Sequence, residues 1–189
     1  LQALAESRAG HLTDSVRLWR RALELDPTDV KAAYALAQEI ERQGGAEQEA
    51  EAQRVLEALL SRTENLPARL DYARLSAKRG DAAALAKALA PLTTASAAWP
   101  AAARERLAAL QSAAKVNPRA AATQVAFLRN FLVREVAYRR SLAQITTPLD
   151  AIGEPLVRFV TLPAPTAAPA APDTAITFTL QPAEGWAGE

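Results

Sequence analysis

Apolar residues recur at intervals of three and four along residues 1–145, the spacing that places them on one face of an α-helix. We expect a truncated first helix over 1–9. Further helices are expected over 15–25, 30–43, 47–62, 67–79, 81–91, 98–114 and 118–143. Asp26-Pro27 ends one of them, because a proline disfavours the helical conformation in the residue before it. Asn117-Pro118 begins the last, as an N-cap followed by a proline in the first turn.

The pattern changes near residue 146. Apolar and polar residues alternate over 156–162 and over 175–180, which predicts two short β-strands. Between them, 163–172 is a tract of alanine and proline that suits a stiff, extended spacer. The chain is therefore interpreted as a helical body, residues 1–145, followed by an extended tail, residues 146–189.

Glycines in the body mark a repeat. Gly10, Gly44 and Gly80 each follow one predicted helix and precede another, and they are 34 and 36 positions apart. A spacing near 34 residues with two helices in each period is typical of helical repeat proteins.

Two stretches carry a more specific pattern. The positions concerned are Ser15, Trp19, Ala22 and Pro27, then Ala33, Leu36, Ala37, Ile40 and Gly44. They resemble the second and first helices of the tetratricopeptide repeat family, with small residues in place of the family's Trp and Gly on the first helix. A third repeat keeps Tyr72 and Ala73 but has Arg69 where a large apolar residue is expected. The resemblance implies an all-α solenoid of about three antiparallel helix pairs, closed by a divergent capping pair over 98–114 and 118–143.

In this family the first helices of the pairs line a concave groove that usually holds a segment of a partner protein. By register, the residues of the groove are Lys31, Tyr34, Gln38, Glu41, Arg42, Leu70, Arg74 and Lys78. The paired Lys and Asn residues with which some members clamp a carboxylate terminus lack their Asn partners here. Chaperone-type recognition is therefore not expected.

A second candidate surface lies at the end of the body and in the tail. The predicted helix 118–143 is apolar around much of its circumference, which favours neighbours on more than one side. The predicted strands have no sheet of their own and need a partner to join. The residues expected to dock are Phe127, Phe131, Tyr138, Phe159, Phe178 and Trp186. The same predicted helix carries a row of arginines that either pairs with an acidic partner or is solvated: Arg129, Arg134, Arg139 and Arg140.

Composition excludes several chemistries. The chain has no cysteine and one histidine, His11, so thiolate metal sites and a conventional catalytic triad are not expected. A net charge of +1 gives no electrostatic basis for nucleic-acid binding. No apolar run reaches the roughly 18 residues that a membrane-spanning helix needs. Glu47, Glu49, Glu51 and Glu57 are interpreted as a solvated helix face. We expect no enzyme activity, cofactor or metal.

A looser resemblance concerns the order of the segments. The chain has helical repeats first, then Gly153-Glu154-Pro155 with a short apolar strand, and then the alanine and proline tract. This order resembles bacterial proteins in which tetratricopeptide repeats precede an FG-GAP (VCBS) β-propeller of the ASPIC/UnbV-associated kind. This resemblance implies the helical front of a longer exported protein. It favours a periplasmic or extracytoplasmic location, with a cytoplasmic one as the alternative.

The leading functional hypothesis is a scaffold that docks other protein subunits through its last helix and tail, within a bacterial assembly that can be membrane-associated. The alternative is an adaptor that binds peptides reversibly in the groove. The two differ in which residues a partner needs, those of the groove or those of the last helix and tail.

Overall fold

The computed structural model describes residues 2–146, 157–158 and 181–182. The chain divides into two compact units, Leu1–Thr147 and Pro148–Glu189, which are described separately. The described part of the first unit is helical, as the apolar periodicity predicts. Its helices are α1 (Gln2–Arg8), α2 (Leu12–Leu25), α3 (Val30–Gln43), α4 (Ala46–Leu60), α5 (Leu66–Arg79), α6 (Ala82–Ala95), the 3₁₀ turn η1 (Ser96–Ala98), α7 (Ala101–Val116), α8 (Ala121–Leu132) and α9 (Val136–Ile145).

In the second unit, β1 (Val157–Arg158) pairs antiparallel with β2 (Gln181–Pro182), Val157 lying opposite Pro182. The first predicted strand, 156–162, is described only at β1. The second, 175–180, lies outside the described residues, as do Phe159, Phe178 and Trp186.

Side chains and glycines fix the helix ends. Asp29 accepts hydrogen bonds from the backbone N–H groups of Lys31 and Ala32 at the start of α3, and Asn65 does the same from Ala68 at the start of α5. These caps satisfy amides that have no partner within the helix. Gly44 and Gly80 end α3 and α5 with φ of 75°, a backbone conformation that favours glycine. The regularly spaced glycines at 44 and 80 therefore mark the ends of helices.

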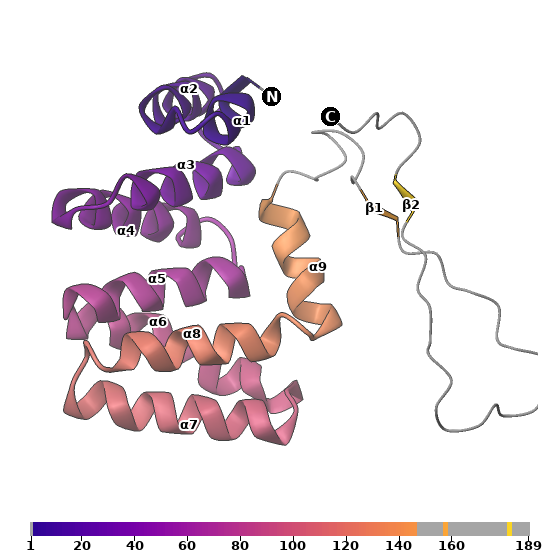
Figure 1. Cartoon of the computed structure of the whole chain (residues 1–189). Coiled ribbons are helices and arrows are strands. Elements are labelled where there is room, and N and C mark those ends of the chain that lie inside the picture. The colour runs from indigo at the N-terminus through magenta and orange to yellow at the C-terminus, as the bar shows by residue number, and fades with distance from the viewer. Residues whose placement is uncertain (1, 147–156, 159–180, 183–189) are drawn as a thin grey trace, which may run out of the picture. The chain divides into compact units, whose positions relative to one another are not determined.

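From α1 to α6 each helix packs against the next, and the helix pairs lie in layers (Figure 1). Alanines lie at the closest approaches: Ala32, Ala52, Ala68 and Ala73 have no exposed surface. Small side chains let helix backbones approach, and larger ones fill the space alongside. Trp19, 8% exposed, is one of these and belongs to the core.

The last helices depart from the expected order. Helix α8, not α7, packs on α5, while α7 contacts α6 and α8, so that α5, α6, α7 and α8 form a closed ring of neighbours. In the final pair it is thus the second helix, α8, that packs against the first helix of the preceding pair. None of the described helices is long and apolar enough to cross a membrane.

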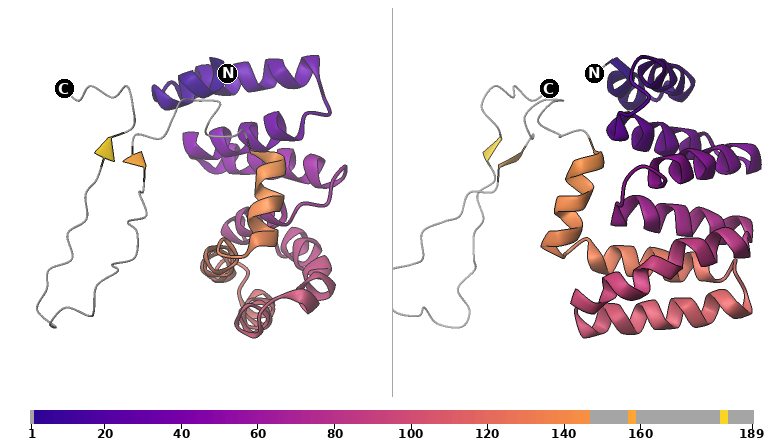
Figure 2. Two further views of the ribbon diagram at one scale, coloured as in Figure 1. Left: turned by 90° about the vertical axis from the view of Figure 1, so that its right-hand side faces the viewer. Right: turned by 180° about the vertical axis from the view of Figure 1, so that it is seen from behind.

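The prediction of one helix over 118–143, as half of a capping pair, is wrong. The chain turns at Val133–Glu135, and α9 runs across the layers, contacting α5 and α3 (Figures 1 and 2). Tyr138 and Ile145, each 1% exposed, are buried by this packing. Tertiary burial therefore overrides the local preference for a continuous helix.

Candidate functional site

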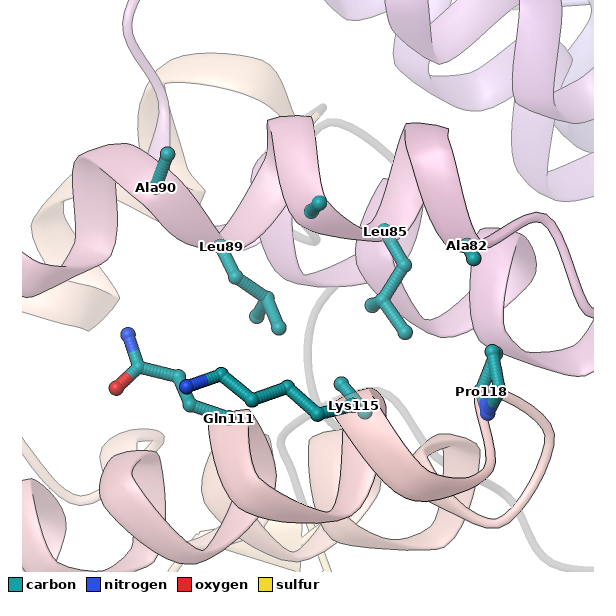
Figure 3. Close-up of a pocket in the computed structure, with 9 residues that line it drawn as sticks. Ala82, Leu85, Leu89, Ala90, Gln111, Lys115 and Pro118 are labelled. Atoms are coloured by element: carbon teal, nitrogen blue, oxygen red, sulfur yellow. The ribbon is translucent and has the colours of Figure 1, made fainter.

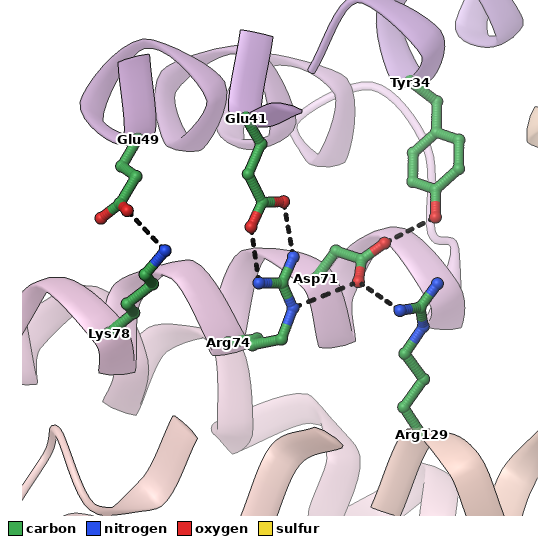
Figure 4. A network of polar contacts seen from close by, with 7 residues as sticks. All are labelled: Tyr34, Glu41, Glu49, Asp71, Arg74, Lys78 and Arg129. Carbon is green, nitrogen blue, oxygen red and sulfur yellow. Dashed lines mark hydrogen bonds and ion pairs between the residues drawn. The ribbon is translucent and has the colours of Figure 1, made fainter. Parts of the chain in front are cut away.

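The predicted groove residues lie beside a buried carboxylate (Figure 4). Tyr34 on α3 is 1% exposed, and its hydroxyl donates a 2.5 Å hydrogen bond to Oδ2 of Asp71 on α5. The other oxygen, Oδ1, lies 3.8 Å from Nε of Arg74 and 3.6 Å from Nη1 of Arg129 on α8. Asp71 therefore joins three helices that are distant in sequence.

Arg74 completes the link between α3 and α5. Its two terminal nitrogens each donate a 2.6 Å hydrogen bond to one oxygen of Glu41. Two parallel bonds between a planar guanidinium and a carboxylate fix orientation as well as charge. These hydrogen bonds raise the pKa of Arg74, so the side chain stays charged.

Other groove residues are paired as well. Lys78 lies 2.5 Å from Oε1 of Glu49, and Arg42 donates to Glu39 at 3.0 Å and to Oγ of Ser7 at 2.8 Å. Glu49, interpreted from the sequence as part of a solvated face, is thus an ion-pair partner. Glu51 pairs with Arg20 and Glu57 with Lys87 in the same way. Glu49, Glu51 and Glu57 thus bridge to neighbouring helices, which refines the solvated-face interpretation, while Glu47 and Glu57 are exposed.

A cavity of about 320 Å³ lies among these charges. Its lining residues are Gln38, Glu39, Glu41, Arg42, Asp71, Arg74 and Arg129. Three arginines and three carboxylates balance, so the formal charge of the lining is zero. A neutral, internally paired lining offers little attraction to a charged ligand, because such a ligand has to break an existing pair to bind.

The structure places the predicted groove residues differently from one another. Tyr34 and Leu70 are buried in the packing, Lys31 is half-buried, and Gln38 is exposed at the cavity. Sequence reasoning missed Asp71 and assigned Arg129 to a solvent-facing or partner-facing row. The signal for Asp71 was a carboxylate between Leu70 and Tyr72, on the predicted helix that also carries Arg74. Nothing local could pair it with Arg129, 58 positions later.

The titratable groups of this site favour structure over catalysis. Burial, and then the negative charge of Asp71, raise the pKa of Tyr34, and burial raises the pKa of Tyr138. Both phenols stay protonated well above neutral pH, so neither is poised as a base. Within the described residues, no three His, Asp or Glu side chains gather as a metal site would require.

Helix α9 lies next to this network. The Asn65 side chain donates a 2.8 Å hydrogen bond to the backbone carbonyl of Ser141 on α9. The buried hydroxyl of Tyr138 has no hydrogen-bond partner among the described residues, and neither has Oδ1 of Asp71. Arg129 on α8 interacts with the Tyr138 hydroxyl and opposes the rise in its pKa. The packing of α9 on α5 is therefore mostly apolar, with one well-formed hydrogen bond, from Asn65.

Large apolar side chains are exposed along the second half of α8 and at the turn into α9. Phe127, Val133 and Val136 are 51%, 44% and 60% exposed, whereas Phe131 is half-buried with the Arg106 guanidinium 5.5 Å from its ring centre. We call Phe127, Val133 and Val136 the α8–α9 corner. Among the described residues, Leu25 and Val116 are also large, apolar and exposed, at 73% and 87%.

A second cavity, about 700 Å³, lies between α6 and α7 (Figure 3). Leu85 and Leu89 of α6 point into it, toward Gln111 and Lys115 of α7. Alanines form much of the remaining lining.

Comparisons with protein families, curated proteins and solved structures find no match for this chain.

Proposed function

We propose that this chain is a non-enzymatic protein-interaction scaffold, a tetratricopeptide-type α-solenoid that docks within a larger bacterial assembly through the end of its helical body. The observation that carries the proposal is the α8–α9 corner, where three large apolar side chains are exposed within ten residues. Exposed apolar clusters of this kind mark protein contact sites more often than isolated apolar residues do.

The state of the groove supports the same proposal. Arg74, Lys78 and Arg42 already have carboxylate partners within the chain, and Tyr34 is buried. A partner that used these side chains would have to replace short, partly buried ion pairs. The corner, in contrast, needs only to lose water from apolar surface, which is favourable.

Groove binding is the second candidate. Gln38 and Arg42 line the 320 Å³ cavity and are exposed, so a peptide that makes neutral hydrogen bonds could engage them without displacing the buried pairs. Docking through Phe159, Phe178 and Trp186, and an extracytoplasmic location, stay predictions on residues outside those described.

The test is capture of partners from the source organism by the tagged chain and by variants of each surface. We expect Phe127→Ser with Val133→Ser to lose the proteins that the wild type captures. The matched control, Leu25→Ser with Val116→Ser, removes exposed apolar residues elsewhere and should capture them normally. Circular dichroism and thermal unfolding check that all variants fold.

The groove variant, Gln38→Ala with Arg42→Ala, separates the two candidates. Unchanged capture by this variant agrees with the scaffold. Loss of capture by the groove variant, with the corner variant unaffected, would establish the adaptor instead. Normal capture by every variant would reject both surfaces.

A further inference from the structure

The junction between α8 and α9 bends without a residue that breaks helices. From residue 119 to residue 147 the sequence has no glycine and no proline. Val133 keeps helical angles, with φ −59° and ψ −20°, while Glu135 is extended, with φ −79° and ψ 133°. Arginine and glutamate, at 134 and 135, are good helix formers. Local sequence therefore favours one continuous helix, and the bend is imposed from elsewhere.

The bend is imposed by the seat of α9, which we define as the surface of α3 and α5 that α9 covers. Tyr138 and Ile145 are buried there, Leu142 packs against the core, and Asn65 holds the Ser141 carbonyl. The hydrogen bond from Asn65 spans 76 positions, and α3 and α5 end more than 50 positions before α9 begins. Contacts of α9 with α3 and α5 therefore do not require that α9 and its seat belong to the same copy of the chain.

The seat holds α9 imperfectly. The Tyr138 hydroxyl is buried without a well-formed hydrogen bond among the described residues, and its polar neighbour is the Arg129 guanidinium of α8. An unsatisfied buried polar atom loses its bonds to water without replacement, so it weakens the packing that buries it. Glu135, the N-cap of α9, makes no side-chain capping bond either. Release of α9 therefore restores hydration to the Tyr138 hydroxyl and lets the junction become helical.

We propose that α9 exchanges between two copies of this chain. In the exchanged dimer Glu135 takes helical angles, α8 and α9 join into one helix, and each α9 occupies the seat on α3 and α5 of the other copy. The occupant is a second copy because the seat is already complementary to α9 residue by residue. Exchange of an identical element between copies re-forms the same contacts and needs no new interface. The proposal is independent of the scaffold function.

Val136→Pro tests the junction without disturbing the bent form. Residue 136 is the first of α9, where proline is favoured, and Glu135 before it already has the extended angles that a following proline requires. The same proline forbids a helix that continues through 135. Val136 is 60% exposed, so loss of its side chain removes little packing.

The measurement is light scattering coupled to size exclusion, after unfolding and refolding at low and at high protein concentration. We expect the wild type to yield a dimer fraction that rises with refolding concentration. Val136→Pro should yield at least tenfold less dimer and keep the wild-type circular dichroism. Val136→Ala, the matched control, removes the same side chain but favours the helix, and should dimerise at least as well as the wild type.

Cross-linking identifies the exchanged element. The chain has no cysteine, and Glu64 and Ala137 line one cavity of about 350 Å³ between α5 and α9. In Glu64→Cys with Ala137→Cys, a short bis-maleimide should link the two positions within monomers and between the chains of isolated dimers. A wild type that stays monomeric at all concentrations would overturn the proposal. Equal dimerisation of Val136→Pro, or dimers cross-linked only within chains, would overturn it too.

Discussion

Two helix contacts in this molecule are built in opposite ways. Between α3 and α5 the contact is polar: Glu41 binds Arg74 through two hydrogen bonds, and Tyr34 donates to Asp71 (Figure 4). Between α6 and α7 the contact is mostly apolar and open, with leucines, alanines, Gln111 and Lys115 around a cavity of about 700 Å³ (Figure 3). One side-chain hydrogen bond, from Gln111 to Thr93, joins the two helices. We call them the polar contact and the apolar contact.

The two contacts differ in how strongly they fix the relative position of the helices they join. Hydrogen bonds and bidentate ion pairs are directional, so the polar contact fixes the position of α5 relative to α3. Apolar contacts are non-directional and depend on the surface removed from water. The polar contact therefore fixes how layers align and tolerates little change, whereas the apolar contact has room for larger side chains.

The largest effect is expected from Asp71→Ala, in the polar contact. Asp71 is 4% exposed, and its removal leaves the Tyr34 hydroxyl without an acceptor and Arg129 without its carboxylate neighbour. Removing one partner of a buried charged group costs about 3 kcal/mol or more in the free energy of unfolding. Chemical denaturation with urea measures it. Asp71→Asn, the control, still accepts from Tyr34 and should lose about half as much. Equal losses would show that charge, and not the hydrogen bond, matters.

The same contrast explains what the sequence could predict. The helices and their ends follow from local signals, since the 3.6-residue apolar period, Asp29 and Asn65 as caps, and the glycines at 44 and 80 act within a few residues. The break between α8 and α9 could not be foreseen, because it depends on burial of Tyr138 against distant helices. The reversed order of α7 and α8 is equally non-local.

For the candidate site, the sequence identified Arg74, Lys78 and Arg42 but not their partners. A register assigns positions to a face of a helix, and it does not reveal whether a neighbouring helix supplies a countercharge. Glu41 and Arg74 lie one repeat apart, so this pair could have been found by comparing repeats. The contact between Asp71 and Arg129 could not, because α8 takes a place that the repeat order assigns to α7.

An intermediate effect is expected from a matched pair of substitutions on α6, one buried and one at the cavity of the apolar contact. Ala88 has no exposed surface, and Ala88→Leu should lower the free energy of unfolding by about 1–3 kcal/mol through overpacking. Ala86 is exposed and lines the cavity, so Ala86→Leu should raise it by up to about 1 kcal/mol, since the added carbons gain burial without a clash. Urea denaturation measures both. A loss from Ala86→Leu as large as that from Ala88→Leu would show that the apolar contact has no spare room.

The smallest effect is expected from alkaline pH, and it distinguishes the two contacts. Burial raises the pKa of Tyr34 and Tyr138 above the usual value of 10.0, so the folded state keeps both phenols protonated where the unfolded chain ionises them. The stability held by these groups is complete below about pH 10 and is lost as the pH rises further, at up to about 1.4 kcal/mol per pH unit for a phenol that stays protonated in the folded state. Tyr34→Phe removes one phenol, so its free-energy difference from the wild type should shrink by about 1 kcal/mol between pH 10 and pH 11, because the unfolded phenol is already half ionised at pH 10. Ala86→Leu adds no titrating group, and its difference should stay constant over that range. A constant difference for Tyr34→Phe as well would mean that Tyr34 ionises equally in both states, which its burial beside Asp71 opposes.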